Sequence, residues 1–267
     1  MTVLSSLFVS HGAPTLVLDD VPARDFLRGV AETLPRPTAI IVVSAHYESV
    51  GTVKVLTSAK PRTIHDFGGF APELYQIRYP APGAPDLAGR VIDLLEDAGL
   101  SAEADESWGF DHGTWVPLSL IWPEADIPVL AVSVDPTAGP SHHYRLGQAL
   151  VPLAKDGVLV VGSGALTHNL GEIRRLGRHL DLETQDWVAR FAAWTSKAIA
   201  ENRIDDLLAY RDRAPDAVRN HPTDEHLMPL YAALGAGGGQ SPGRRLHDST
   251  TFGVLAMDAY GFGAVAV

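Results

Sequence analysis

Residues 221 to 226 (HPTDEH) gather two histidines and two carboxylates in one short motif. Imidazole nitrogens and carboxylate oxygens bind divalent metal ions, and an imidazole also transfers protons near neutral pH. Thr223 is a suitable N-cap and the acidic pair suits the positive end of a helix dipole, so we expect a helix to begin here. Taken alone, the motif also fits a capped surface helix that happens to carry histidines. The positions of the other histidines favour a metal site.

Three more histidines come directly after, or a few residues after, apolar runs typical of buried parallel strands. The runs are residues 3–9, 38–44 and 157–161, and the histidines are His11, His46 and His168. Because the carboxyl ends of parallel strands meet at one edge of a sheet, where ligands bind, we expect these side chains to converge. His112 lies in the segment WGFDHGTW, where we expect a loop whose glycines free the backbone to place an imidazole. Such a set predicts metal ligands with open coordination positions, which indicate catalysis.

The elements that must position these histidines predict one α/β domain over residues 1–267, with a central, mostly parallel mixed sheet flanked by helices. The 267 residues suffice for a sizeable core, and no linker-like stretch divides them. We expect further strands at residues 53–57, 127–134 and 250–257, and helices at residues 23–34, 85–98, 142–153, 182–202 and 205–210. The metal site is expected at the C-terminal edge of the strands.

Composition excludes several classes of protein. The formal net charge of −11 argues against nucleic acid or an anionic membrane as the partner and favours a small molecule. No apolar run reaches the roughly 18 residues of a membrane span, and the first residues lack a basic region, so we expect a cytoplasmic protein. The chain has no cysteine, so a metal must be held by His, Asp or Glu. The turn GSGALTHNL from Gly162 lacks the lysine of a phosphate-binding loop, which argues against a nucleotide site.

Six motifs, in this order and over almost the whole chain, resemble the DODA-type class III extradiol ring-cleavage dioxygenases. They are SHGAP from Ser10, SAHY from Ser44, IHDFGGF from Ile64, DHGTW from Asp111, GSGALTHNL from Gly162 and HPTDEH from His221. The resemblance implies an α/β fold and a non-haem metal enzyme. Such an enzyme opens a catechol ring beside its two hydroxyls using O₂, with 4,5-DOPA-type catechols as substrates.

The resemblance also implies a ligand set. His11 and His46 match the first two metal ligands of the family, and His226 would be the third. The protocatechuate branch of the family completes its site with a glutamate, and here Glu225 stands beside His226. Neighbouring residues point about 100° apart on a helix, so only one of them should ligate. The resemblance favours His226, with Glu225 and His221 as alternative ligands.

Other roles follow from the same resemblance and from the proposed chemistry. His168 matches a second-sphere histidine of the family and is our candidate base for a catechol hydroxyl, because an imidazole titrates near neutral pH. His112 is expected to hydrogen-bond the oxygen or to donate the later proton. His65 and Arg78 are expected to position the side chain or carboxylate of the substrate.

The expected cofactor is one divalent metal ion, with Fe(II) needed for activity. Three histidines suit Zn(II) as well, but zinc has no redox chemistry and would not support ring cleavage. Two alternatives stay open: a zinc-dependent hydrolase that uses His168 or Glu225 as base, and a non-catalytic metal-binding interaction protein of the same fold. The sequence gives no indication of oligomeric state.

Overall fold

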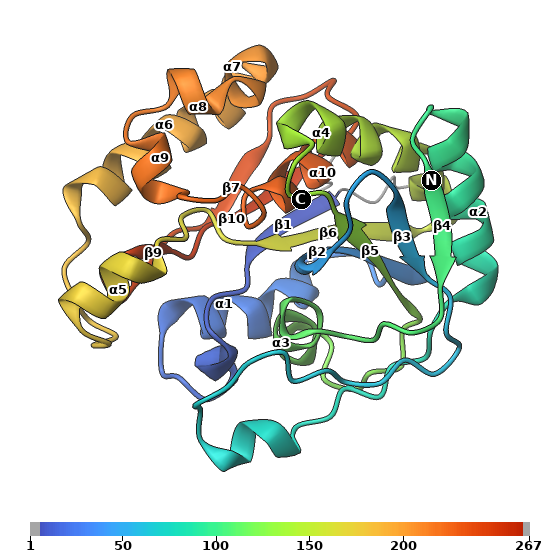
Figure 1. Cartoon of the computed structure of the whole chain (residues 1–267), viewed down its shortest axis with the longest axis horizontal. Coiled ribbons are helices and arrows are strands. Elements are labelled where there is room, and N and C mark those ends of the chain that lie inside the picture. Colours follow the sequence, from blue (N-terminus) through green and yellow to red (C-terminus); the bar gives the residue numbers. More distant parts are fainter. Residues whose placement is uncertain (1–5, 264–267) are drawn as a thin grey trace.

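A mixed sheet of eight strands runs through residues 6–263, the part of the chain that this computed structural model describes (Figure 1). In spatial order its strands are β4 (Ala102–Asp105), β3 (Val53–Leu56), β5 (Val129–Val134), β2 (Ala39–Glu48), β6 (Val158–Gly164), β1 (Ser6–Ser10), β10 (Ala259–Phe262) and β7 (Arg244–His247). The central strands β5, β2, β6 and β1 are parallel, whereas β3 and β10 pair with them antiparallel. The predicted single-domain α/β fold with a mostly parallel mixed sheet is therefore confirmed.

Helices cover both faces of the sheet, which is why its central strands are apolar throughout. On one face lie α2 (Pro85–Asp97), α4 (Gly139–Leu150) and α10 (Met228–Ala236), and on the other lie α1 (Pro22–Val30) and α3 (His112–Ile121) (Figure 1). Strand β6 shows the alternation of faces directly. Gly162 faces the backbone of α10, and the hydroxyl of its neighbour Ser163 donates to the carbonyl of Gly113 in α3.

A helical segment between β6 and α10 lies beside the β10 and β7 edge of the sheet (Figure 1). It contains α5 (Leu170–Leu176), α6 (Asp186–Ala200), α7 (Ile204–Leu208), α8 (Tyr210–Arg213) and α9 (Ala217–Asn220). Short 3-10 turns are η1 (Pro14–Val17), η2 (Ala31–Thr33), η3 (Pro72–Gln76) and η4 (Val151–Asp156), and β8 (Thr250–Thr251) pairs with β9 (Leu255–Ala256). No helix in the 6–263 range combines the length and apolar character that a membrane crossing requires.

The limits of several strands differ from the prediction. Residues 250–257 do not form the last strand of the sheet, because Phe252 and Gly253 adopt positive φ angles of 58° and 67° and reverse the chain. The last strand of the eight-stranded sheet is instead β10, which follows β9 after this reversal. Strand β6 continues through the predicted turn to Gly164, and β2 continues past Ser44 to Glu48 with an irregular register. The first predicted strand began at residue 3, and residues 3–5 lie outside the described range.

Two predictions of local structure near the histidines were wrong, one of a loop and one of a helix start. His112 does not lie in a loop but begins α3, where the side chain of Asp111 caps the helix by accepting the Thr114 N–H at 3.0 Å. Residues 222–227 form turns, and the helix after them begins only at Met228. Within this segment Asp224 accepts the Tyr210 hydroxyl at 2.7 Å and the guanidinium of Arg211, two contacts from outside the motif.

Close packing of α4 on α10 depends on two glycines and gives a testable prediction. A Cβ at Gly147 would overlap the carbonyl oxygen of Ala232, and a Cβ at Gly235 would overlap that of Tyr144. We expect Gly147→Ala to lower the free energy of unfolding by about 1–3 kcal/mol through overpacking.

The matched control is Gly89→Ala in α2, where a Cβ meets no atom within 4 Å. This substitution should raise the free energy of unfolding by up to about 1 kcal/mol, because alanine is the better helix former. Chemical denaturation of both variants measures the difference, and equal effects of the two substitutions would contradict the packing argument.

Candidate metal centre

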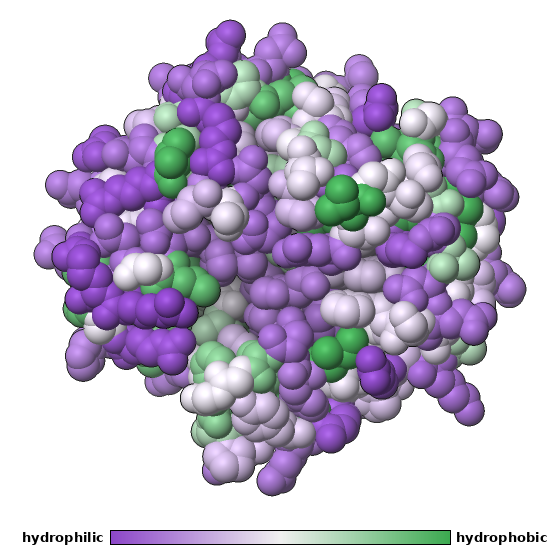
Figure 2. Space-filling view, viewed as in Figure 1, coloured by the Kyte–Doolittle hydropathy of each residue, from purple (hydrophilic) through white to green (hydrophobic). Residues whose placement is uncertain are grey.

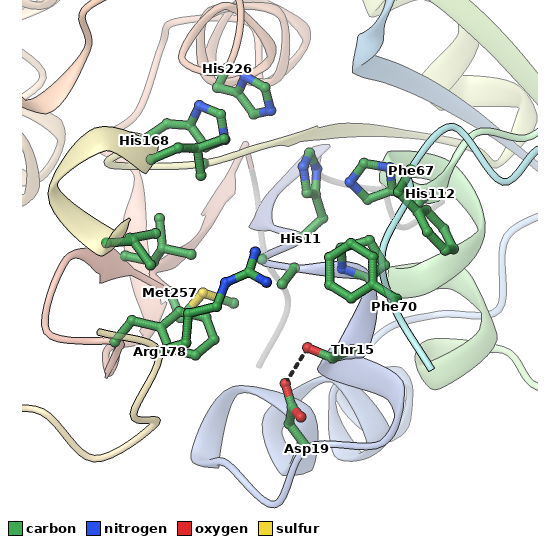
Figure 3. A pocket seen from close by; sticks show the side chains of 18 of the residues that line it. His11, Thr15, Asp19, Phe67, Phe70, His112, His168, Arg178, His226 and Met257 are labelled. Carbon is green, nitrogen blue, oxygen red and sulfur yellow. Dashed lines mark hydrogen bonds between the residues drawn. The ribbon is translucent and has the colours of Figure 1, made fainter. Parts of the chain in front are cut away.

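Five histidines from separate parts of the chain meet at the carboxyl edge of the sheet, and Figure 3 labels His11, His112, His168 and His226 among them. His11 directly follows β1, His46 lies near the end of β2, and His168 comes four residues after β6. His112 is the first residue of α3, and His226 lies in the turn that precedes α10. The sheet edge therefore brings together the histidines that the sequence singled out at strand ends.

The Nε2 atoms of three of these histidines converge. His46 Nε2 lies 3.1 Å from His11 Nε2 and 3.3 Å from His226 Nε2. With metal–nitrogen bonds of about 2.0–2.1 Å, two ligands of one ion lie about 3–3.4 Å apart, so this spacing fits a shared ion. The side chains of His11, His46 and His226 thus form a candidate ligand set, which we call the histidine triad.

The hydrogen bonds of the Nδ1 atoms of His11 and His226 determine that their Nε2 atoms carry the lone pairs. The Ser163 hydroxyl donates to the Gly113 carbonyl, so it accepts a hydrogen bond from the Nδ1–H of His11 at 3.1 Å. His226 Nδ1 donates to Glu225 Oε1 at 2.8 Å. Both histidines therefore carry their single ring proton on Nδ1 and present unprotonated Nε2 atoms to the centre, as metal-bound histidines do. In this geometry Glu225 orients the triad from behind.

A carboxylate also stands behind His46 and His112. Asp66 Oδ2 lies 2.9 Å from His112 Nδ1 and 3.5 Å from His46 Nδ1, and Asp66 Oδ1 accepts the backbone N–H of His112 at 2.9 Å. Burial raises the pKa of Asp66, but the hydrogen bonds and charges of His112 and His46 outweigh it and lower this pKa to about 2. Asp66 is therefore an anion that orients two imidazoles. We assigned it no role from the sequence, although it lies in the IHDFGGF motif.

Burial keeps the triad neutral. It is the largest cause that lowers the pKa of His11 and His226 well below the ordinary value and that of His46 to about 3, and charge repulsion from neighbouring imidazoles adds to it. A neutral imidazole is the form that binds a metal ion. Three neutral, converging donors in a buried site fit a divalent cation.

His168 stands beside the triad. Its ring stacks on His226 with centroids 3.4 Å apart and planes inclined by 13°, and burial lowers its pKa to about 4 despite the opposing charge of Glu225. Among the described residues its ring nitrogens have no hydrogen-bond partner, whereas its backbone N–H donates to the Asn220 carbonyl. Two groups of ligand atoms lie within 4.8 Å of one another: those of His11, His46 and His112, and those of His168, Glu225 and His226. The short contact between His46 and His226 joins the two groups.

A cavity of about 590 Å³ opens in front of the histidines. Phe67 and Phe70 form an aromatic wall, Leu255 and Met257 add apolar surface, and arginines from α5 and the segment after it complete the lining (Figure 3). Figure 2 shows a recess at this place, with apolar residues on its rim. The cavity is large enough for a small aromatic molecule.

Besides Glu225, which stands behind His226, three predicted site residues lie outside this lining. His221 is fully buried, donates from Nε2 to the Leu166 carbonyl at 2.8 Å and packs against the ring of Phe191. His65 donates from Nε2 to the Ile77 carbonyl at 3.1 Å, and Arg78 donates to that carbonyl at 2.8 Å. This geometry favours supporting roles for all three, and a direct contact of His65 or Arg78 with substrate stays a prediction.

The fold and the site define an α/β protein with a histidine metal centre at the carboxyl edge of its sheet. Residues 6–263 match the family described as the catalytic LigB subunit of aromatic ring-opening dioxygenase, and the chain belongs to this family. The resemblance inferred from the six motifs is thereby confirmed, and the chain is that of a metal-dependent aromatic ring-cleaving dioxygenase.

Named relatives and a solved structure agree with this assignment. The chain is 39% identical over 268 residues to a 4,5-DOPA dioxygenase extradiol from Beta vulgaris, with 97% of each chain covered. It is 38% identical over 244 residues to a protein of the same name from Escherichia coli (strain K12), covering 90% of this chain and 88% of the relative. A crystal structure of an uncharacterized protein from Escherichia coli K12 superposes with a TM-score of 0.80 at 33% identity, covering 97% of this chain and all of the other.

Metal binding can be tested ligand by ligand. We expect calorimetry to show one tightly bound Zn²⁺, used here as a redox-inert probe. Asp66→Asn, which removes only an orienting partner, should weaken this binding about 10- to 100-fold. His11→Ala, which removes a ligand, should weaken it more. The matched control is His142→Ala in α4, outside the cluster. An unchanged affinity in His11→Ala would contradict the histidine triad.

Proposed function

We propose that this protein is an extradiol dioxygenase that opens a catechol-type ring, of the 4,5-DOPA kind, beside its two hydroxyls with O₂, and that its active metal is Fe(II). The observation that carries the proposal is the one-sided histidine triad: three nitrogens approach the centre from one side, and the other side opens into the cavity. That arrangement leaves coordination positions for two catechol oxygens and O₂. The names of the relatives support the same chemistry.

The proposed metal ligands are His11, His46 and His226. The unprotonated Nε2 atoms of His11 and His226 and the spacing of all three Nε2 atoms suit a divalent ion. Ser163 and Glu225 hold two of the rings from behind, and Asp66 stands behind the third. A bound ferrous ion would supply the redox chemistry with O₂ that the side chains of the site lack. The side chains around it bind the ring, move protons and exclude water.

His168 is the proposed general base. A catechol bound in front of the triad must lose a hydroxyl proton, and a base must lie within hydrogen-bond reach of it. His168 lines the cavity and its ring stacks on that of His226, so it would lie beside the oxygens of a catechol bound in front of the triad. Its ring nitrogens are not engaged by another described residue, so they can accept this proton.

His112 is proposed to serve the opposite side of the centre. Its ring lies 3.9 Å from that of His46 by centroids, and Figure 3 shows it across His11 from His168. Asp66 fixes a proton on His112 Nδ1, so Nε2 is the atom that faces the site. From there His112 can hydrogen-bond an oxygen of the reacting molecule and donate a proton to it in a later step.

The aromatic wall suits a planar ring. Phe67 and Phe70 lie with centroids 5.4 Å apart at an interplanar angle of 86°, and the ring of Phe67 also meets that of His112 edge to face at 5.8 Å. An apolar wall of this kind packs against an aromatic substrate and displaces water from the reaction centre. The loop that carries both phenylalanines therefore contributes shape, while the histidines contribute the chemistry.

The proposed function is tested by oxygen uptake. Protein stripped of metal and reloaded anaerobically with Fe(II) should consume O₂ in proportion to catechol and release a yellow ring-opened product, whereas zinc-loaded protein should not. The dioxygenase would be contradicted if the protein consumed no O₂ with any catechol and any metal. Metal-dependent hydrolysis by the zinc form would then favour the hydrolase.

The role of His168 is tested by His168→Gln, which keeps a polar side chain of similar reach. We expect kcat for ring opening to fall about 10²- to 10⁴-fold, as for removal of a general base, while bound iron stays stoichiometric. Metal analysis of the same sample separates the two effects. If iron is lost together with activity, His168 holds the metal and does not act as the proposed base.

A further inference from the structure

Two arginines line the cavity without an acidic partner. Arg174 lies in α5 and Arg178 two residues after its end, and within residues 6–263 neither guanidinium has a carboxylate oxygen within 4.0 Å. Their neighbour Arg175 differs, because it pairs with Glu172 at 2.7 Å on the surface. Glu172 also binds Arg219 at 3.0 Å, so the only acidic residue of α5 is already shared by two arginines.

The Arg178 side chain is directed into the cavity. Its guanidinium carbon lies 5.5 Å from the centroid of the Phe70 ring, a distance at which an arginine stacks on an aromatic face. Figure 3 shows this side chain between Met257 and Phe70, with the guanidinium toward the histidines. The contact with Phe70 holds the cation over the aromatic wall and leaves its N–H donors available to a bound molecule.

The charges around the cavity favour an anion at this end. Asp19 is the acidic residue among those that line the cavity, and its Oδ2 accepts the Thr15 hydroxyl at 2.6 Å. The carboxylates of Asp66 and Glu225 are held behind the histidines. Two arginines therefore line the cavity of a protein whose net charge is −11, so this excess of positive charge is local.

We propose that Arg174 and Arg178 form an anion subsite that binds a carboxylate on the side chain of the catechol, so that the enzyme selects ring substrates with an anionic tail. The inference rests on the proposed function and names its substrate class. A guanidinium binds a carboxylate through two parallel, charge-assisted hydrogen bonds, which an ester or an amide cannot match. The role in carboxylate binding that the sequence suggested for Arg78 is thus assigned to Arg178, which lines the cavity.

The first test compares acids with their methyl esters. The substrates are 3,4-dihydroxyphenyl acids with side chains of one to three carbons, their esters, and 4-methylcatechol as the tail-free reference. For at least one chain length, we expect kcat/KM of the iron-loaded protein to be about 10- to 100-fold higher for the acid than for its ester, the range expected for hydrogen bonds to a charged group. Arg178→Met should remove most of this preference, because it should lower kcat/KM for the acid far more than for the ester or for 4-methylcatechol.

The matched control is Arg175→Met, which removes the same charge three residues earlier in the chain, from the part of α5 outside the cavity lining. It should leave the preference for the acid intact. The subsite would be overturned if the unmodified protein turned over the acid and its ester equally well. It would also be overturned if Arg178→Met lowered kcat/KM equally for both. A loss in Arg175→Met as large as in Arg178→Met would show general charge attraction and would also overturn it.

A binding measurement separates the subsite from the catalytic proposal. Calorimetry on the zinc-loaded protein, which does not turn over, should show tighter binding of the acid than of the ester, with the difference lost in Arg178→Met. If no catechol is turned over but this difference is found, the proposed function fails and the subsite stands. If catechols are turned over but neither binding nor kcat/KM distinguishes acid from ester, the subsite fails and the proposed function stands.

Discussion

The structure depends on one constraint: three neutral imidazoles, two of them buried and one half-buried, are held with their Nε2 atoms close together. Unprotonated ring nitrogens without a partner are unfavourable in a buried site, and a bound cation relieves this cost. Each ring is held from behind by a group on a different element: His11 by Ser163 of β6, His226 by Glu225 of the turn before α10, and His46 by the more distant Asp66 of the aromatic loop. The centre therefore requires that the sheet, this turn and the loop be correctly placed at the same time.

The close approach of α10 to β6 is part of this requirement. Gly162 and Gly164 flank Ser163, and a Cβ on either would overlap backbone carbonyl oxygens, of Pro229 and of His226 respectively. The two glycines let the helix and its preceding turn pass directly over the strand, which brings His226 beside the strand-end histidines. The motif GSG thus serves the metal centre through packing, with its serine on one face of β6 and its glycines on the other.

The sequence predicted the fold class and the histidine-bearing strand ends, because buried parallel strands are continuous apolar runs and their ends lie at one edge. It did not predict α3, since that helix is buried on nearly all sides and has no polar face. The turn at residues 222–227 was also missed, and the contacts of its Asp224 with Tyr210 and Arg211 come from outside the motif. Arg174 and Arg178 carried no local signal either: only the tertiary fold shows that their acidic neighbour Glu172 is engaged elsewhere.

The most direct test of the account is to locate the metal. Anomalous diffraction at the iron edge, on crystals reloaded anaerobically with Fe(II), would show which side chains bind it. The account predicts one peak at about 2.1 Å from the Nε2 atoms of His11, His46 and His226, with its remaining positions facing the cavity. A peak bound by His168 and Glu225, or one that leaves out His11 and His46, would contradict it.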